Sequence, residues 1–227
     1  MGTRGRVRAR QPGPDLRRPR RGRRRLGSSL EAALSAEPDH VSAYSLIVEE
    51  GTRMAARVRR GELAAPDDDA LADRYLMADE ALAKAGFTPY EVSNWARSPE
   101  SRSEHNLLYW TGGHWWGVGP GAHSHVGGTR WWNVKHPAAH AARLAARSSP
   151  GQAREVLTAR ERRFERVLLE LRVERGCPLD LLEPRGRQAA RRAVAEGLLD
   201  PAAHDAGRAV LTRRGRLLAD AVVRDLT

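Results

Sequence analysis

Hydrophobic positions in the first third of the chain follow a strand pattern, then a helix pattern, then a strand pattern again. Residues 40–48 are apolar on both alternating faces, which is typical of a strand buried between helices in a parallel sheet. Residues 66–69 supply N-cap chemistry for a helix, and Gly86 stands where a helix C-terminus is expected. The stripe of this helix consists of Leu71, Tyr75, Ala78 and Leu82. Because residues 87–92 again predict a strand, we expect a βαβ unit and an α/β fold class.

Capping patterns predict where other helices begin. Ser28 and Glu31 fit a capping box for a short helix over residues 30–36, and Thr158 and Glu161 fit another for a helix with its apolar stripe from Phe164 to Leu171. Further segments follow: a helix ending near Gly197, a small hairpin between 198–199 and 209–212, and a final helix striped by Leu217, Leu218, Val222 and Leu226. This order resembles a winged helix.

Composition divides the chain into four segments. Residues 1–25 contain Arg, Gly and Pro with little apolar content, which predicts a disordered tail. Residues 26–136 hold the α/β pattern and an aromatic region, residues 137–157 read as a linker, and residues 158–227 read as a mostly helical domain. We expect two folded parts, each with its own core.

The strong positive charge belongs to the tail. The net charge is +11, whereas residues 1–25 hold 11 Arg and one Asp, so 11 − 1 = +10 lies there and 11 − 10 = +1 remains. A single cysteine, Cys177, indicates a reducing compartment, and we expect a cytoplasmic protein. No apolar run approaches the roughly 20 residues that a membrane helix needs.

The region between Trp95 and Trp132 is unusual because it holds all six tryptophans of the chain. It contains His105-Asn-Leu-Leu-Tyr-Trp110, which fits an HNxxYW pattern, and Trp115-Trp-Gly-Val-Gly-Pro-Gly-Ala-His-Ser-His125. With 38–52, 90–96, 130–133 and 211–220, these stretches resemble, in order, the HemW-type heme chaperones. This family is a radical-SAM relative of oxygen-independent coproporphyrinogen III oxidase.

The resemblance implies a fold and a function. It implies a partial radical-SAM (β/α) barrel remnant followed by a winged-helix-like helical domain, in a protein that binds heme and delivers it to heme-accepting proteins. The family's CxxxCxxC motif has no counterpart here. We therefore expect that this chain alone binds neither a [4Fe–4S] cluster nor S-adenosyl-L-methionine, and that it is not itself an enzyme. The resemblance begins near Leu26, so we expect an N-terminally truncated family member with an out-of-frame start.

The motif residues are candidate heme contacts. Imidazole and phenol groups can ligate heme iron, and indole offers a flat apolar surface, so His105 is the candidate iron ligand beside Asn106, Tyr109 and Trp110. Arg130 is a candidate partner for a heme propionate. The alternatives are that the four motif residues only pack and hydrogen-bond locally, and that Arg130 forms an exposed cation–π pair.

Three histidines and three glycines of the aromatic region are further candidates for a functional role. His114, His123 and His125 favour heme contact over a dedicated metal site, because no carboxylate or thiolate lies close in sequence. The glycines at 117, 119 and 121 fit neither GxGxxG nor a P-loop, so they predict a tight turn, with propionate contact as the alternative.

Two other functions stay open. The first is a coproporphyrinogen III oxidase-like radical-SAM protein. The second is a nucleic-acid-binding module that uses Arg185, Arg187, Arg191 and Arg192. Residues 151–227 hold 16 basic and 12 acidic residues, a balance of 16 − 12 = +4, which is low for a nucleic-acid partner.

Overall fold

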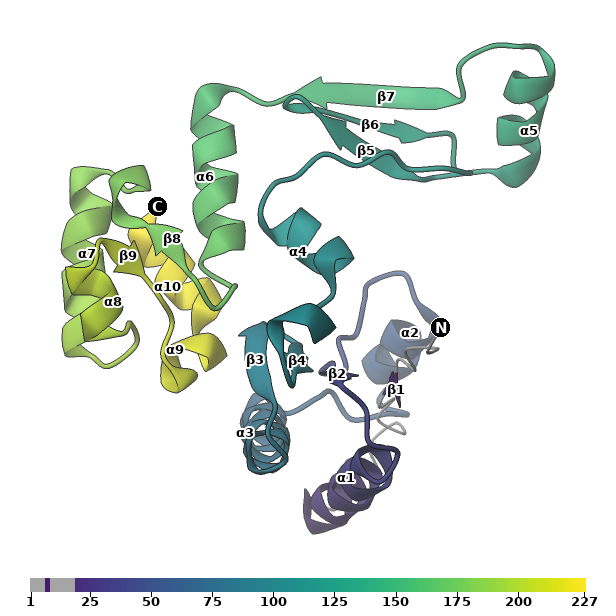
Figure 1. The fold of residues 1–227 in the computed structure, drawn as a ribbon. Coiled ribbons are helices and arrows are strands. Elements are labelled where there is room, and N and C mark those ends of the chain that lie inside the picture. Colours follow the sequence, from purple (N-terminus) through teal and green to yellow (C-terminus); the bar gives the residue numbers. More distant parts are fainter. Residues whose placement is uncertain (1–6, 9–18) are drawn as a thin grey trace. The chain divides into compact units, whose positions relative to one another are not determined.

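The computed structural model describes residues 7–8 and 19–227, and the backbone divides into two compact units, Met1–Arg102 and Ser103–Thr227 (Figure 1). Most of the expected disordered tail lies outside the described residues. Its last part does not fit that expectation, because residues 19–25 belong to helix α1, Pro19–Leu34. The predicted capping box at Ser28 is also wrong: Ser28 and Ser29 lie inside α1, where their hydroxyls donate to the carbonyls of Arg24 and Arg25.

The first unit has a small mixed sheet and three α-helices among its described residues. The elements after α1 are α2 (Arg53–Arg59), α3 (Asp68–Lys84) and a 3-10 helix, η1 (Pro99–Ser101). The strands are β1 (Val7–Arg8), β2 (His40–Ser42), β3 (Thr88–Glu91) and β4 (Asn94–Ala96). The predicted helix and its caps are confirmed: Asp67 accepts a hydrogen bond from the Ala70 N–H, and Gly86 follows the C-cap with a φ of 83°.

The expected parallel βαβ unit is only partly right. The sheet order is β1-β2-β4-β3, and β4 pairs antiparallel with both β2 and β3, so it separates the two strands that α3 connects. The predicted strand over 40–48 is too long. Residues 43–48 are not strand, and Tyr44 and Ile47 are 56% and 72% exposed; among the described residues, no strand pairs with this segment.

Two pairs of buried polar side chains in this unit lie within hydrogen-bond distance of each other. Val41, Leu82, Phe87 and Trp95 form an apolar cluster. The indole N–H of Trp95 donates to Asp79 Oδ1 at 2.9 Å, and His40 Nε2 lies 2.8 Å from the Tyr90 hydroxyl. These bonds offset the cost of burying the polar groups; the first connects α3 to β4, and the second connects β2 to β3.

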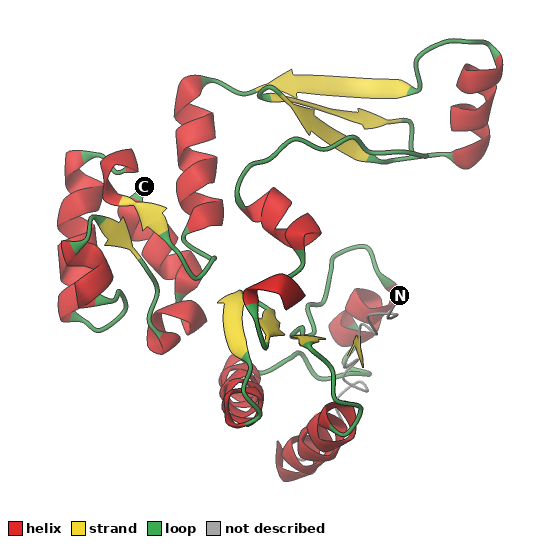
Figure 2. Cartoon of the chain, in the orientation of Figure 1, coloured by secondary structure: helices red, strands yellow, loops and turns green. Residues whose placement is uncertain are grey.

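The second unit combines a three-stranded antiparallel sheet with a helical part (Figure 2). Its first elements are α4 (Glu104–Trp110), β5 (His123–Val126), β6 (Thr129–Asn133), α5 (Pro137–Ala145) and β7 (Gly151–Val156). Then follow α6 (Ala159–Glu170), β8 (Cys177–Pro178), η2 (Leu179–Leu181), α7 (Pro184–Ala195), α8 (Pro201–Asp205), β9 (Arg208–Ala209), α9 (Arg213–Leu217) and α10 (Ala219–Leu226).

The segment expected to be a linker, residues 137–157, holds regular structure. It contains α5 and β7, and β7 pairs antiparallel with β6. The sequence 151–156 has neither an apolar run nor an alternation of apolar and polar residues, so its pattern does not predict a strand. We place the sheet and the helical part in one compact unit that begins at Ser103.

In the helical part, the predicted helix cap is present, whereas the predicted hairpin and final helix differ from the structure. The capping box at Thr158 is confirmed, because its hydroxyl accepts from the Glu161 N–H while the Glu161 carboxylate accepts from the Thr158 N–H. The predicted hairpin is partly right: Leu199 and Leu211 form an antiparallel bridge, but residues 201–205 are helix α8 and β9 pairs with β8. The predicted final helix is divided into α9 and α10.

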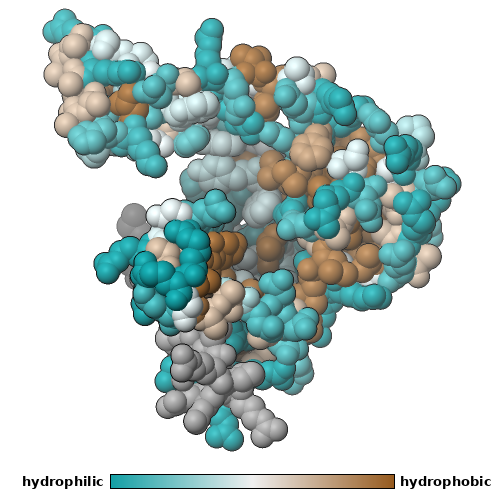
Figure 3. All heavy atoms as spheres, turned by 180° about the vertical axis from the view of Figure 1, so that it is seen from behind, coloured by the Kyte–Doolittle hydropathy of each residue, from teal (hydrophilic) through white to brown (hydrophobic). Residues whose placement is uncertain are grey.

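The surface is mixed in character. Figure 3 shows hydrophilic and hydrophobic side chains interspersed on the face that it draws. Large exposed apolar side chains occur in both units, and among them Trp116 is 71% and Val118 is 90% exposed. Across the described residues, no helix combines the length and apolar character needed to span a membrane.

Candidate aromatic cavity in the second unit

Helix α4 carries all four residues of the HNxxYW motif. Ser103 begins the helix by accepting a hydrogen bond from the Asn106 N–H. His105 and Tyr109 stand one turn apart on the same side, and their rings meet edge to face with centroids 4.9 Å apart. The Tyr109 and Trp115 ring centroids are in turn 4.7 Å apart, so the side chains of the helix form part of an aromatic cluster.

The glycine-rich run folds the chain back on itself. Trp115 and His125 exchange two backbone hydrogen bonds of 2.9 Å, so the residues between them form a closed loop. A Cβ atom on Gly117 would lie 2.1 Å from the His123 carbonyl oxygen, and Gly119 has a φ of 104°. Only glycine permits this close approach and this backbone conformation. The structure thus agrees with the predicted tight turn.

One face of the three-stranded sheet gathers the side chains that carry chemistry. His123 lies opposite Trp132, and His125 lies opposite Arg130, which in turn lies opposite Glu155. Directly opposed residues of antiparallel strands point to the same face. The His123 and Trp132 rings stack at an angle of 25° with centroids 5.7 Å apart.

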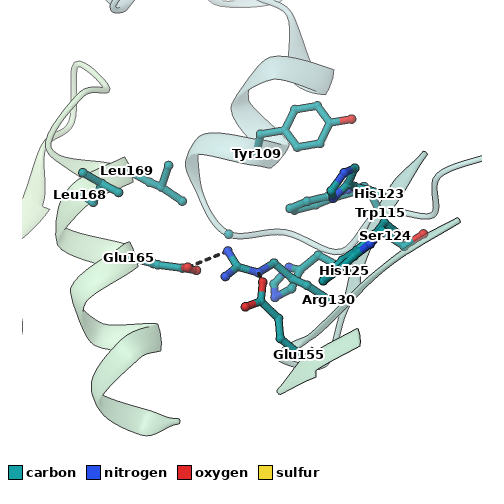
Figure 4. A pocket seen from close by; sticks show the side chains of 12 residues that line it. Tyr109, Trp115, His123, Ser124, His125, Arg130, Glu155, Glu165, Leu168 and Leu169 are labelled. Atoms are coloured by element: carbon teal, nitrogen blue, oxygen red, sulfur yellow. Dashed lines mark hydrogen bonds and ion pairs between the residues drawn. The ribbon is translucent and has the colours of Figure 1, made fainter. Parts of the chain in front are cut away.

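This face, helix α4 and helix α6 line a cavity of about 490 Å³ that is open to solvent (Figure 4). Tyr109 enters from α4 and Leu168 and Leu169 from α6, while the sheet contributes imidazole and indole groups. The lining consists of Tyr109, Gly112, Trp115, His123, Ser124, His125, Arg130, Trp132, Glu155, Glu165, Leu168 and Leu169. The volume is in the range of small-molecule and cofactor sites, and the lining suits a flat, largely apolar ligand with a few polar groups.

Arg130 is held by two carboxylates. Its Nε donates to Glu155 Oε1 at 2.7 Å and its Nη1 to Glu165 Oε1 at 2.6 Å. Burial acts to lower the pKa of the guanidinium, but the bonds to Glu155 and Glu165 outweigh burial and raise it. One positive and two negative charges leave this side of the cavity with a formal balance of −1.

A second cavity of about 200 Å³ adjoins the first. Both cavities have Gly112, His125, Glu165 and Leu169 in their walls. The smaller cavity adds Trp110 from the end of α4, Thr111 and His114 from the segment that follows, and two arginines from α6, Arg162 and Arg166. The shared residues therefore separate an aromatic chamber from a smaller, more basic one.

Of the five candidate heme contacts that the sequence suggested, the structure places some in the walls of the cavities and others outside them. Tyr109 and Arg130 line the larger cavity and Trp110 lines the smaller one. His105 is exposed and reaches the aromatic cluster through the ring of Tyr109, and Asn106 is half-buried on the same helix. Neither residue belongs to the lining of these two cavities.

Other cavity residues escaped the sequence analysis. The sequence pattern does not identify Glu155 or Glu165, because their ion pairs with Arg130 join residues 25 and 35 positions apart in the chain. The pattern does not identify Leu169 either, because an apolar residue of an amphipathic helix is expected to pack in the core. His123 and His125 are two residues apart on one strand, and this spacing places their side chains on one face of the sheet.

The chain's own residues do not fit an iron–sulfur cluster. Such clusters are held by several thiolates, and Cys177 is the single cysteine of the sequence. It is buried in the core of the helical part, where desolvation and the nearby Glu170 carboxylate raise the pKa of the thiol to about 11. Within residues 7–8 and 19–227, no group of three His, Cys, Asp or Glu side chains is arranged to hold a metal ion.

The fold has a counterpart among solved structures. The chain superimposes on Escherichia coli coproporphyrinogen III oxidase (HemN), which is described as a radical-SAM enzyme, with a TM-score of 0.68 and 16% identity, over 90% of this chain and 51% of that one. The molecule therefore has part of the HemN-type α/β fold, without a closed barrel among the described residues.

Sequence relatives narrow this class. No family model matches the chain. It is 56% identical over 201 residues to the heme chaperone HemW of Mycobacterium tuberculosis, covering 88% of this chain and 50% of the relative. It is 34% identical over 151 residues to HemW of Bacillus subtilis, covering 66% and 40% of the two chains. The chain belongs to the HemW family of radical-SAM, coproporphyrinogen III oxidase-like proteins.

A mitochondrial relative shares a shorter stretch. The chain is 46% identical over 94 residues to the radical S-adenosyl methionine domain-containing protein 1 of Danio rerio, which is 41% of this chain and 21% of that one. The chain spans about half the length of the Mycobacterium relatives that it matches.

Proposed function

We propose that this chain holds heme in the aromatic cavity of the second unit and passes it to heme-accepting proteins in the cytoplasm, as the name heme chaperone of its relatives suggests. The observation that carries this proposal is the cavity of about 490 Å³ with Tyr109, Trp115, Trp132 and two histidines in its wall. A porphyrin ring is flat and apolar, so it gains dispersion and stacking contacts from such rings.

The motif residues then have distinct roles. Tyr109 contacts the porphyrin from α4, Trp110 contacts it through the smaller cavity, and His105 and Asn106 stand at the outer side of the helix. The family resemblance makes His105 a candidate iron ligand, but His105 lies outside both cavities. Arg130 binds a heme propionate. To do so, its guanidinium releases Glu155 or Glu165, because it can hydrogen-bond to a propionate carboxylate as well as to a glutamate carboxylate.

Delivery requires that a bound heme remain accessible. Tyr109, Trp115 and Trp132 are half-buried rather than buried, and His123 is exposed. A ring held against them keeps an edge in solvent, from which an acceptor protein can take it.

Adjacent tryptophans provide a matched test. Trp115 lines the cavity, whereas Trp116 is 71% exposed and meets Trp131, which points to the opposite face of the sheet. Hemin titration followed by the Soret band should show at least tenfold weaker binding for Trp115→Leu and near-parent binding for Trp116→Leu. Circular dichroism of both variants checks the fold. Equal affinities of the two variants, or no saturable binding by the parent, would contradict the proposal.

A further inference from the structure

His125 occupies the wall that the two cavities share. Its backbone N–H and carbonyl are both bonded to Trp115 at 2.9 Å, and its ring lies 4.9 Å from the Trp115 ring. The ring of His114 meets it edge to face at 6.0 Å. The imidazole is therefore fixed in place before any ligand arrives, which is what a metal-ligating side chain requires.

A hydrogen bond sets the tautomer of this imidazole. His125 Nδ1 lies 3.0 Å from the carbonyl oxygen of Gly113. A carbonyl oxygen only accepts, so Nδ1 carries the proton and donates it, and Nε2 of the neutral ring keeps its lone pair. An Nδ1–H bonded to a backbone carbonyl is the arrangement that orients histidine ligands and increases their basicity.

The other histidines near the site are less suited. His114 Nε2 accepts a hydrogen bond from the Gly127 N–H at 3.3 Å, so the lone pair of its neutral ring is already engaged. His105 is exposed and stands outside both cavities. His123 lines the larger cavity, but it is exposed and its ring stacks on Trp132, so it offers a flat face rather than a directed lone pair.

We propose that His125 is the axial ligand of the heme iron, through Nε2, in place of the exposed His105. This inference rests on the proposed function, because it requires that heme be held in this cavity. The step is the formation of one coordinate bond from the Nε2 lone pair to iron. No proton leaves the ring, because Nε2 carries none in this tautomer, and the oxidation state of iron does not change.

The test compares variants that separate ligation from packing. His125→Asn keeps a side-chain N–H near the position of Nδ1, and so the bond to Gly113, but it offers iron no imidazole. His125→Gly leaves a space that free imidazole can enter. Ferric hemin bound to the full chain is examined by absorption and electron paramagnetic resonance, with His105→Asn and His123→Asn as matched controls.

We expect both His125 variants to lose the Soret position and ferric signal of the parent, and we expect imidazole to restore them only in His125→Gly. Metal-free protoporphyrin IX should bind the parent and His125→Asn within threefold, because the porphyrin contacts remain. The inference is overturned if His125→Asn keeps the parent spectrum, or if only His105→Asn or His123→Asn changes it; porphyrin binding would then still support the cavity. If the parent binds neither hemin nor protoporphyrin IX, the proposed function fails as well.

Discussion

Arg130 and Glu165 join the three-stranded sheet to helix α6 through an ion pair of 2.6 Å between Nη1 and Oε1. The partners lie 35 residues apart in the chain, and both line the aromatic cavity. Since Glu155 on the neighbouring strand binds the same guanidinium, one arginine holds together two strands and a helix at the edge of the cavity.

Replacing Arg130 with Met should therefore weaken the second unit. Methionine retains much of the aliphatic stem but leaves the half-buried carboxylate of Glu165 without this partner. We expect the free energy of unfolding in urea to fall by about 1–2 kcal/mol, after allowing for the partial exposure of the pair. Glu155→Gln, which removes only the more exposed interaction, should cost about 0.5 kcal/mol or less. Equal stability of the parent and Arg130→Met would show that the ion pairs contribute nothing.

Glu155→Gln should also tighten hemin binding. Heme propionates are anionic, and the two carboxylates beside Arg130 exceed its single charge. Removing one of them should lower the dissociation constant by roughly two- to fivefold in low salt. The measurement is a Soret titration, with Glu196→Gln, an exposed site outside the cavity, as the control. A dissociation constant that rises or stays constant contradicts this prediction.

Cys177 should be unreactive in the folded protein. Burial and the Glu170 carboxylate raise the pKa of its thiol to about 11, so at pH 8 almost no thiolate is present. A thiol-specific disulfide reagent should modify the folded chain at least a hundredfold more slowly than the chain in guanidinium chloride. Rapid modification without denaturant would show that the core around β8 opens readily.

Two glycines with positive φ should differ in their tolerance of a side chain. A Cβ atom on Gly176 would lie 1.9 Å from the Ala209 carbonyl oxygen, whereas Gly207 has no heavy atom within 4 Å of that position. Gly176→Ala should cost about 3 kcal/mol or more because β8 and β9 must separate, and Gly207→Ala about 1 kcal/mol from backbone strain alone. Thermal unfolding of both variants measures the difference. Similar losses would mean that the close approach at Gly176 relaxes easily.

The capping box of α6 should make stability depend on pH. The backbone N–H and the hydroxyl of Thr158 lower the pKa of the Glu161 carboxyl. A depressed pKa in the folded state adds stability above the unfolded pKa, and this stability is lost as the pH falls through the folded value. Thr158→Ala should destabilise the protein by about 1 kcal/mol at pH 7 and by less at acid pH. A loss that does not change between pH 7 and pH 3 would contradict the coupling.

The sequence predicted best where the decisive interactions are local. The helix over residues 68–84 and the capping box at Thr158 depend on residues within a few positions of each other, and both are present. The sequence did not predict strands correctly where they depend on pairing with segments far away in the chain. Residues 43–48 look like a strand but pair with no strand among the described residues, and residues 151–156, which lack an apolar pattern, form a strand because β6 lies beside them.

The same distinction between local and distant interactions applies to the candidate site. The sequence by itself identified an aromatic region, its HNxxYW motif and Arg130, because residue type and spacing carry that information. Only the tertiary structure decided that His125 lines both cavities while His105 lies outside them, and that Arg130 is bound by Glu155 and Glu165. The physical reason is that these outcomes depend on a loop closing between Trp115 and His125 and on a helix 35 residues away, contacts that local propensity does not encode.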